Sequence, residues 1–273
     1  MVSRLIATLA IAAVPITALA QPPAPGAGIT GIAHVAYRVS DLDREIAFLG
    51  RLGYQQSFAI TGNGGKVLEV FVKVNDRQFI ELYPQADPPQ PLGWMHVCFE
   101  AGDLNALFNF LASNSLKPSA VHKAGAGNLI SAMNDAEGSV VEFTQYMPGS
   151  RHTLDRGLHL GPNRVSTELI GYDLPVRELA AEDQFYVQLG FEAETAASSV
   201  HLTTPGAPNV HIALRPLNAS SKPQLLLAVT DARQTEKQLK NAGVNAVRNG
   251  GLVIVHDPDG NAFIFLEAGP GSK

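Results

Sequence analysis

The chain has 273 residues, 45% of them hydrophobic, with a formal net charge of −5 and a single cysteine. This size and composition suit a soluble globular protein of roughly one to three domains. The mild charge and the lack of a basic run argue against a nucleic-acid-binding protein, and one cysteine excludes an intrachain disulfide.

The first twenty residues have the pattern of a secretory signal peptide. Arg4 precedes an apolar run from Leu5 to Leu19, and an A-x-A sequence ends at Ala20. The run is shorter than the about 20 apolar residues of a membrane-spanning helix, although an uncleaved anchor remains the alternative. The sequence therefore predicts cleavage after Ala20, export to the periplasm or the medium, and no membrane contact of the mature chain. Residues 21–28, rich in Pro and Gly, are predicted to be a flexible tether.

An internal repeat organises the rest of the chain. The segments that start at Ser40 and Arg177 each read as an amphipathic helix followed by Leu-Gly-aromatic, at 52–54 and 189–191. Ser40 with Asp43 resembles a capping box at the first of these helices. The segments that start at Asp103 and at 231 also match each other, and a D-x-x-G turn recurs at 135–138 and 257–260.

These matches predict four units, at about 29–86, 92–148, 165–217 and 223–268, each with one strand, one helix and about three further strands. They group into an N-terminal domain (29–148), a linker (149–164) and a C-terminal domain (165–268). The predicted fold class is α+β, with four βαβββ modules.

Four residues of the types that bind metals lie in apolar strands of the N-terminal domain. They are His34, Glu81, His96 and Glu142, in "GIAHVAYRV", "QFIELYP", "WMHVCFE" and "SVVEFTQY". The alternation of strands places all four on the face away from the helices, whereas Ala33, Val35, Tyr37 and Val39 face the helix. Burying a carboxylate among apolar neighbours costs several kcal/mol unless it is paired or binds a metal. The pattern therefore predicts a divalent-metal site.

The same alternation suggests further site residues. Phe79, Tyr83, Trp94 and Tyr146 share the ligand face and are candidates for a substrate pocket, with ordinary packing between sheets as the alternative. His122, before a Gly-rich loop, is a candidate acid or base near the cleft or an exposed strand-end residue. Glu81 is read as a fourth ligand or as a partner of Arg38 or Arg77. The histidines at 152, 159, 201 and 256 are read as structural.

The segments "HVAYRVSDLDREIAFLGRLGY", "FIELYP", "HVCFEAGDLNALFNFL" and "NDAEGSVVEFTQY" resemble the modules of the vicinal oxygen chelate (VOC) superfamily. That superfamily includes glyoxalase I, extradiol dioxygenases and bleomycin-binding proteins, and the resemblance covers about residues 29–268. It implies two incomplete barrels of two modules each, with a divalent metal (Zn, Ni, Mn, Co or Fe(II)) held by the first and last strands of each module. Those places hold His34, Glu81, His96 and Glu142.

The C-terminal half departs from this pattern. Alignment of the repeats places Gly171, Gln224 and Ile264 where His34, His96 and Glu142 stand, and Ile212 or His211 near the place of Glu81. The C-terminal domain is therefore predicted to be a second barrel with a degenerate metal site.

The resemblance implies a small-molecule substrate or ligand and leaves several functions open. The order His-Glu-His-Glu favours a glyoxalase-I-like lyase or isomerase in which Glu142 moves a proton. An extradiol-type dioxygenase using His34, His96 and Glu142 is the second reading. A non-catalytic small-molecule-binding protein is the third, and a homodimer is compatible with all three.

Overall fold

The computed structural model of the chain describes residues 28–267 except 197, 205 and 219–220. The predicted signal peptide and residues 21–27 of the predicted tether lie outside these residues. Within the described part of the chain, no helix has both the length and the hydrophobicity needed to cross a membrane.

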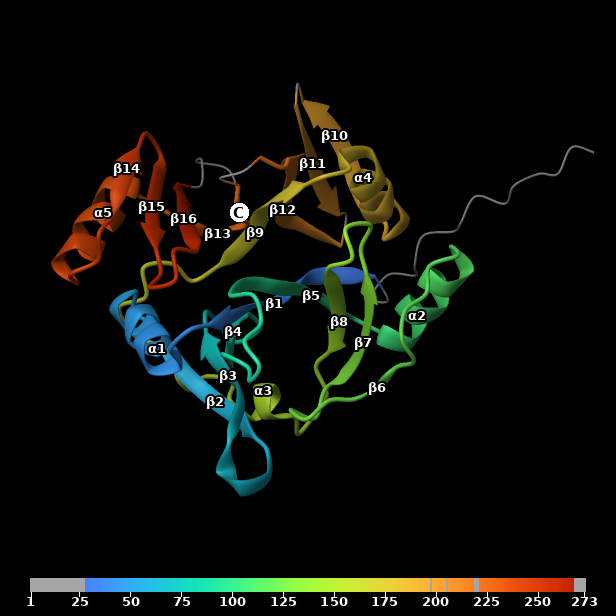
Figure 1. The fold of residues 1–273 in the computed structure, drawn as a ribbon, viewed down its shortest axis with the longest axis horizontal. Coiled ribbons are helices and arrows are strands. Elements are labelled where there is room, and N and C mark those ends of the chain that lie inside the picture. Colours follow the sequence, from blue (N-terminus) through green and yellow to red (C-terminus); the bar gives the residue numbers. More distant parts are fainter. Residues whose placement is uncertain (1–27, 197, 205, 219–220, 268–273) are drawn as a thin grey trace, which may run out of the picture.

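The N-terminal half forms one eight-stranded sheet from two βαβββ modules (Figure 1). The first comprises β1 (Ile29–Val39), α1 (Leu42–Arg51), β2 (Gln55–Thr61), the short 3₁₀ turn η1 (Asn63–Gly65), β3 (Val67–Lys73) and β4 (Phe79–Pro84). The second comprises β5 (Gly93–Ala101), α2 (Leu104–Ser113), β6 (His122–Lys123), β7 (Leu129–Asn134) and β8 (Val140–Gln145).

The C-terminal half repeats this arrangement after a short helix, α3 (Arg151–Leu154). Its first module comprises β9 (Leu169–Val176), α4 (Leu179–Gln188), β10 (Glu192–Ala196), β11 (Ser199–Thr204) and β12 (Ala207–Pro216). Its second comprises β13 (Gln224–Val229), α5 (Ala232–Asn241), β14 (Val247–Asn249), β15 (Leu252–His256) and β16 (Ala262–Glu267). The predicted α+β fold of four βαβββ modules is confirmed.

The two sheets have equivalent strand orders. The first runs β2-β3-β4-β1-β5-β8-β7-β6 and the second β10-β11-β12-β9-β13-β16-β15-β14. In each, the first strands of the two modules pair antiparallel at the centre, and each pairs on its other side with the last strand of its own module, in parallel. The first and last strands of the modules thus form the middle of each sheet.

Local signals explain where the helices begin and end. Gly53 and Gly190, which follow α1 and α4, have positive φ angles of 87° and 97°, as the Leu-Gly-aromatic pattern predicts. The predicted capping box at Ser40 is wrong, because the Asp41 side chain caps α1 by accepting from the backbone N–H of Arg44. Ser40 instead donates its backbone N–H to Asp259 of the second domain, at 2.7 Å.

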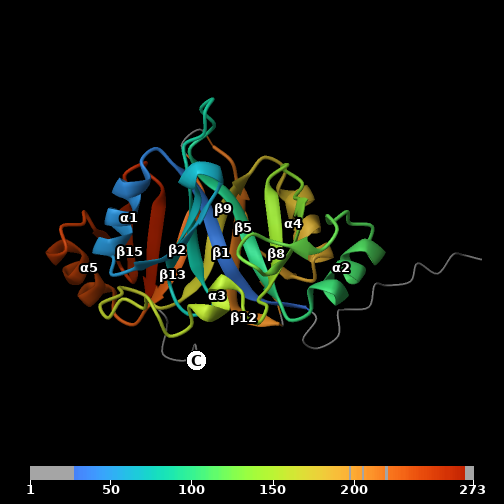
Figure 2. The same cartoon turned by 90° about the horizontal axis from the view of Figure 1, so that it is seen from below.

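The two sheets pack against each other through the face opposite the predicted ligands. Aromatic pairs cross the interface: Tyr37 with Phe263, Trp94 with Tyr172, and Phe99 with Phe191, at ring separations of 5.9, 5.2 and 5.4 Å. The predicted helix-facing set of β1 is buried, with Ala33, Val35, Tyr37 and Val39 at most 1% exposed. Figure 2 shows α1 and α5 at one end of the molecule and α2 and α4 at the other, with the strands between. A shared core therefore fixes the first sheet from behind and leaves its ligand face uncovered by the second domain.

A buried lysine holds the connection between the domains. Lys73, at the end of β3, is fully buried, and its ammonium group donates to the Asp155 carboxylate and to the Leu158 carbonyl, each at 2.9 Å. A buried charge requires such partners. This anchor brings α3 against the first sheet.

Candidate metal centre and its cavity

The four predicted ligands occupy two adjacent rows across the middle of the first sheet. In one row, the strand register places His34 (β1) beside Cys98 (β5), and Cys98 beside Glu142 (β8). Residues that stand side by side in a sheet point to the same face. His34 and Glu142 therefore flank the small Cys98 side chain on one face.

The second row has the same form. Glu81 (β4) stands beside Ala36 (β1), and Ala36 stands beside His96 (β5). Ala36 is two residues from His34, so both rows share one face. A small residue separates the two ligand types in each row, which leaves room above the strands for the four longer side chains to converge.

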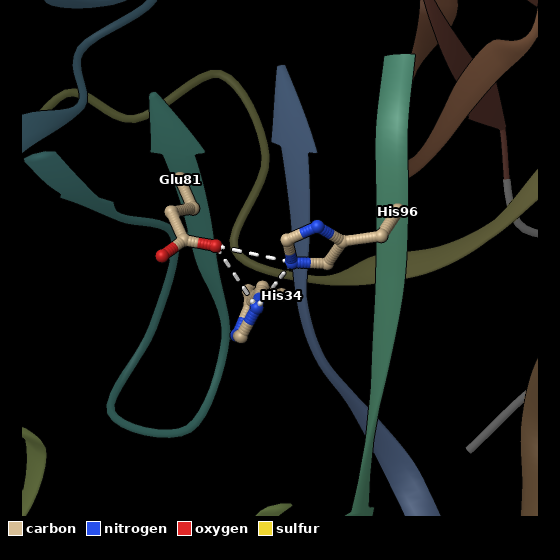
Figure 3. Close-up of side chains that lie close together, drawn as sticks. All are labelled: His34, Glu81 and His96. Atoms are coloured by element: carbon tan, nitrogen blue, oxygen red, sulfur yellow. Dashed lines mark hydrogen bonds and ion pairs between the residues drawn. The ribbon is translucent and has the colours of Figure 1, made fainter. Parts of the chain in front are cut away.

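The ligand atoms do converge (Figure 3). Glu81 Oε2 lies 3.1 Å from His34 Nε2 and 3.2 Å from His96 Nε2, and the two Nε2 atoms are 3.2 Å apart. Glu142 Oε2 completes the group, at 3.6 Å from His34 Nε2 and 3.5 Å from His96 Nε2. His34, Glu81 and His96 are all buried.

These separations fit a single metal ion. Ligand bonds of about 2.0–2.2 Å around a tetrahedral or octahedral ion place neighbouring donor atoms about 3.0–3.5 Å apart. Glu81 Oε2 is buried and accepts no well-directed hydrogen bond, although two imidazole nitrogens lie next to it. A carboxylate oxygen without such a bond is costly unless a cation compensates it. The donors are nitrogen and oxygen, which suit Zn, Ni, Mn, Co or Fe(II).

The electrostatics keep the carboxylates in the form that binds metal. Burial alone would raise the pKa of Glu81, but His34 and His96 lower it well below its usual value. Burial likewise opposes ionisation of Glu142, and the same two imidazoles lower its pKa. Burial alone would lower the pKa of His34, whereas Cys98 and Glu81 raise it well above its usual value. Both carboxylates are therefore ionised at neutral pH.

Residues 31–143 match the family model of the Glyoxalase/Bleomycin resistance protein/Dioxygenase superfamily. That range contains all four converging side chains. The N-terminal domain belongs to this superfamily. The VOC resemblance expected from the sequence is thereby confirmed, and the domain is called the VOC domain below.

Solved structures share the fold over both halves of the chain. The 2,3-dioxygenase LapB from Pseudomonas sp. KL28 is 16% identical, with a TM-score of 0.68 over 89% of this chain and 94% of that one. The Mn(II)-bound glyoxalase from Novosphingobium aromaticivorans is 16% identical, with a TM-score of 0.64 over 87% and 82%. Homoprotocatechuate 2,3-dioxygenase from Arthrobacter globiformis is 12% identical, with a TM-score of 0.66 over 94% and 87%. Comparison with curated protein sequences gives no match. At these identities the likeness shows a common fold.

A cavity of 280 Å³ opens onto the ligands in the VOC domain. Of the predicted pocket and catalytic residues, Tyr83, Tyr146 and His122 line it with His34, Glu81 and Glu142. The volume is near the lower end for small-molecule sites, which are about 300–1,000 Å³. His122 is exposed, and its Nδ1 lies 3.0 Å from the Ala120 carbonyl, so this nitrogen donates there and Nε2 remains free to accept.

Two predicted pocket residues lie elsewhere. Trp94 packs against Tyr172 in the domain interface, because a bulge in β5 at Met95 reverses the alternation between His96 and Trp94. Phe79 keeps the predicted parity but is fully buried below the cavity, within an aromatic cluster that includes Phe58 and Phe71. The prediction that Trp94 lines the ligand cavity is thus wrong, and Phe79 supports the cavity wall from behind.

Sequence reasoning missed several side chains that line the cavity. They are Glu69, Phe71, Lys123, Asn128, Ile130, Thr144 and His152. Glu69 was detectable, since an acidic residue interrupts the apolar strand "VLEVFVK" as Glu81 interrupts "FIELYP". The Tyr83 hydroxyl lies 2.9 Å from Glu69 Oε2 and 3.1 Å from Glu81 Oε1. Burial, and then the Glu81 carboxylate, raise the pKa of Glu69 to about 7.

His152 had no usable sequence signal, because it lies on the short helix α3 in the linker. Its Nδ1 is 2.9 Å from Asn128 Nδ2, and Asn128 Oδ1 accepts from the Met147 backbone N–H at 3.3 Å. The amide is thereby oriented to donate, so His152 carries its proton on Nε2. Burial, and then His34, lower the pKa of His152 to about 3. His152 therefore contributes a neutral wall to the cavity.

Among the residues that the structure describes, the second sheet has no equivalent ligand set. The strand register places Gly171 at the position equivalent to His34 in the first sheet. It likewise places Gln224 at the position of His96 and Ile264 at that of Glu142, as the repeat predicted. In the second sheet His211 pairs with Gly171, as Phe79 pairs with His34 in the first. The position equivalent to Glu81 is therefore Ala213, one residue beyond the predicted Ile212. Only Gln224 among these four side chains carries a metal-binding atom type.

Proposed function

We propose that the VOC domain is a metal-dependent enzyme that binds a small molecule through two neighbouring oxygens and catalyses a glyoxalase-I-like lyase or isomerase reaction. The observation that carries this proposal is the convergence of two imidazole nitrogens and two carboxylate oxygens. The Nε2 atoms of His34 and His96 lie 3.2 Å apart, and each lies within 3.6 Å of one oxygen of Glu81 and one oxygen of Glu142. A bound divalent ion would supply Lewis-acid stabilisation of negative charge on the substrate oxygens.

The two glutamates have different roles in this proposal. The Glu81 side chain is 4% exposed and the Glu142 side chain 22% exposed, and Glu142 stands farther from both imidazoles. Glu81 would therefore hold the ion together with His34 and His96. Glu142, which also lines the cavity, takes the proton from one substrate carbon and returns it to the neighbouring carbon.

The donor set supports a lyase or isomerase. His34, Glu81 and His96 would hold the ion, which leaves a second carboxylate, Glu142, beside it for proton transfer. Extradiol-type oxygenation is the second candidate function. The observation in its favour is that His34, Glu81 and His96 are a buried set of two histidines and one carboxylate even without Glu142, a donor set typical of Fe(II) oxygenases.

Export is part of the proposal. The N-terminal sequence supports a signal peptide cleaved after Ala20, which places the enzyme in the periplasm or outside the cell. N-terminal sequencing of the mature protein from cell fractions would give Gln21 as the first residue. A mature protein in the cytosolic fraction that starts at Met1 would refute this.

The test of function compares three proteins: wild type, Glu142→Gln and His34→Ala. Each is loaded with Mn, Ni, Zn, Co or Fe(II) and assayed with hemithioacetals of 2-oxoaldehydes and with catechols. We expect Glu142→Gln to keep most of its metal and lose about 10²–10⁴-fold in kcat, the usual contribution of a general base. His34→Ala loses both metal and activity.

Three outcomes would contradict this assignment. Full activity of Glu142→Gln would remove the proton-transfer role. Oxygen consumption with catechols and no isomerase activity would favour the dioxygenase. Tight binding of a small molecule by the metal-free protein, without turnover, would favour a binding protein.

A further inference from the structure

The chain's single cysteine lies at the centre of the candidate metal site. Cys98 is fully buried on β5, beside His34 on one side and Glu142 on the other. One ring nitrogen of His34, the Cys98 sulfur and one oxygen of Glu142 all lie within 4.8 Å of one another. These three side chains therefore form a second donor set, which shares His34 and Glu142 with the first.

The thiol has two hydrogen-bonding neighbours, the His34 side chain and the Phe99 carbonyl. Its Sγ donates to the Phe99 carbonyl at 3.9 Å, which is long for a hydrogen bond even to sulfur. The contact with the Phe99 carbonyl is therefore weak, and the strand register holds the sulfur between His34 and Glu142.

We propose that Cys98 is a reserve metal ligand, which with His34 and Glu142 binds thiophilic divalent ions such as Zn²⁺ and Cd²⁺. A soft thiolate donor selects such ions, whereas carboxylates and imidazoles alone serve harder ions such as Mn²⁺. On binding, the ion replaces the thiol proton, which passes to solvent, and a metal–sulfur bond forms. The inference rests on the proposed metal site but not on the reaction assigned to it.

The geometry requires only a small adjustment. A Zn–S bond of about 2.3 Å and Zn–N or Zn–O bonds of about 2.0–2.2 Å place the donors about 3.5 Å apart in a tetrahedral site. The three donor atoms are no more than 4.8 Å apart, so they close by about 1 Å through side-chain rotation. Because His34 and Glu142 belong to both donor sets, a thiophilic ion displaces the ion held by Glu81 and His96.

The test uses light absorption by a metal–sulfur bond. The full mature chain is stripped of metal and titrated with Cd²⁺ and, separately, Co²⁺. We expect a near-ultraviolet sulfur-to-metal charge-transfer band that saturates at one ion per chain. With one cysteine in the sequence, only Cys98 can produce it. Cys98→Ala and Cys98→Ser are expected to lose the band and to bind Cd²⁺ on the order of tenfold more weakly, with Mn²⁺ affinity changed less than about twofold.

A matched control moves the cysteine to the second sheet. Leu226 stands beside Gly171 and Ile264 there, as Cys98 stands beside His34 and Glu142. The double variant Cys98→Ala/Leu226→Cys has one cysteine without the donor set and is expected to give no band. Wild-type protein that binds Cd²⁺ without a band would overturn the inference, and so would a band of equal strength in the double variant. Absence of Mn²⁺ binding would instead refute the underlying metal site.

Discussion

The two domains share a strand order and a strand register, yet within the part of the chain that the structure describes only the first presents a set of metal ligands. His34, His96 and Glu142 correspond to Gly171, Gln224 and Ile264, and the surrounding pairing is the same. The residues that fix the fold therefore differ from those that would carry chemistry. Function resides in a few positions on the face left uncovered, and a duplicated fold can lose them without losing its core.

In the second sheet, the position equivalent to His34 has no space for a side chain. A Cβ atom added to Gly171 would lie 1.7 Å from the His211 carbonyl oxygen, so no side chain fits at the position of His34 unless the backbone moves. Nearby, Asp173 and Arg215 form an ion pair, and they stand where Ala36 and Tyr83 stand in the first sheet. In the second sheet, an ion pair thus occupies positions equivalent to those that lie beside the ligands in the first sheet.

The strongest test of this difference between the two sheets is to remove a histidine from the first sheet. We expect His34→Ala and His96→Ala to reduce metal content from near one ion per chain to trace amounts, because each removes one of four converging donors. Elemental analysis after dialysis measures this.

The matched control is Gln224→Ala, which changes the residue in the second sheet equivalent to His96. Its metal content is expected to equal that of wild type. Unchanged occupancy in both histidine variants, or a loss in Gln224→Ala, would place the metal elsewhere in the chain.

Much of the fold could be predicted from the sequence, because local periodicity and helix-stop glycines repeat in each module. The alternation of β1 from His34 to Val39 was predicted correctly, and the face of His34 with it, although a register shift between Ile32 and His34 interrupts the alternation earlier in the strand. The module repeat then brought Glu81, His96 and Glu142 to equivalent places. Three of four correspondences in the second sheet followed as well, and the fourth was displaced by one residue, to Ala213.

The rest of the cavity could not be predicted because it depends on contacts between distant segments. Lys73 positions the α3 segment, which brings His152 to the cavity from the linker. The bulge at Met95 turns Trp94 away, and alternation alone does not reveal a bulge. Both features arise from packing that local sequence patterns do not encode.

A second comparison concerns two buried acids, one from each domain. Glu45 on α1 is 1% exposed and lies near Asp257 of the second domain, and Glu182 on α4 is fully buried near Asp135 of the first. One oxygen of Glu45 and both oxygens of Glu182 lack a hydrogen-bond partner among the described residues. Burial, and then the facing aspartate, raise the pKa of each to about 8.

These shifts predict a loss of stability as pH rises. The folded chain keeps both protons up to about pH 8, whereas the unfolded chain releases them near 4.5, so the folded state binds more protons between these values. The free energy of unfolding therefore falls from about pH 4.5 to 8, and we expect each of the two acids to contribute a loss on the order of 3 kcal/mol between pH 5.5 and 8.5.

Denaturant unfolding of Glu45→Gln and Glu182→Gln at these two pH values checks this. Each neutral amide is expected to reduce the fall of the unfolding free energy with pH, which we call the slope. The double variant is expected to reduce this slope most. Glu192→Gln, on the exposed strand β10, is the control with a wild-type slope. If the slope of the double variant equals that of wild type, these two acids are not its source.

The smallest expected effect compares two tyrosines of the same cavity. The Tyr83 hydroxyl lies 3.1 Å from Glu81 Oε1, whereas the Tyr146 hydroxyl donates to the Arg77 carbonyl at 2.6 Å and contacts no ligand in the hydrogen bonds described. Loss of a group that orients a ligand costs about 10–100-fold in metal affinity, so we expect Tyr83→Phe to weaken Mn²⁺ binding by about tenfold. Tyr146→Phe removes a hydroxyl of the same kind and should change the Mn²⁺ Kd by less than about twofold, as measured by isothermal titration calorimetry. Equal effects of the two variants would mean that the cavity wall as a whole, rather than the hydrogen bond to Glu81, tunes the metal. That result would weaken the contrast between the two sheets, because it would transfer part of the metal affinity from specific ligand contacts to the general shape of the VOC domain.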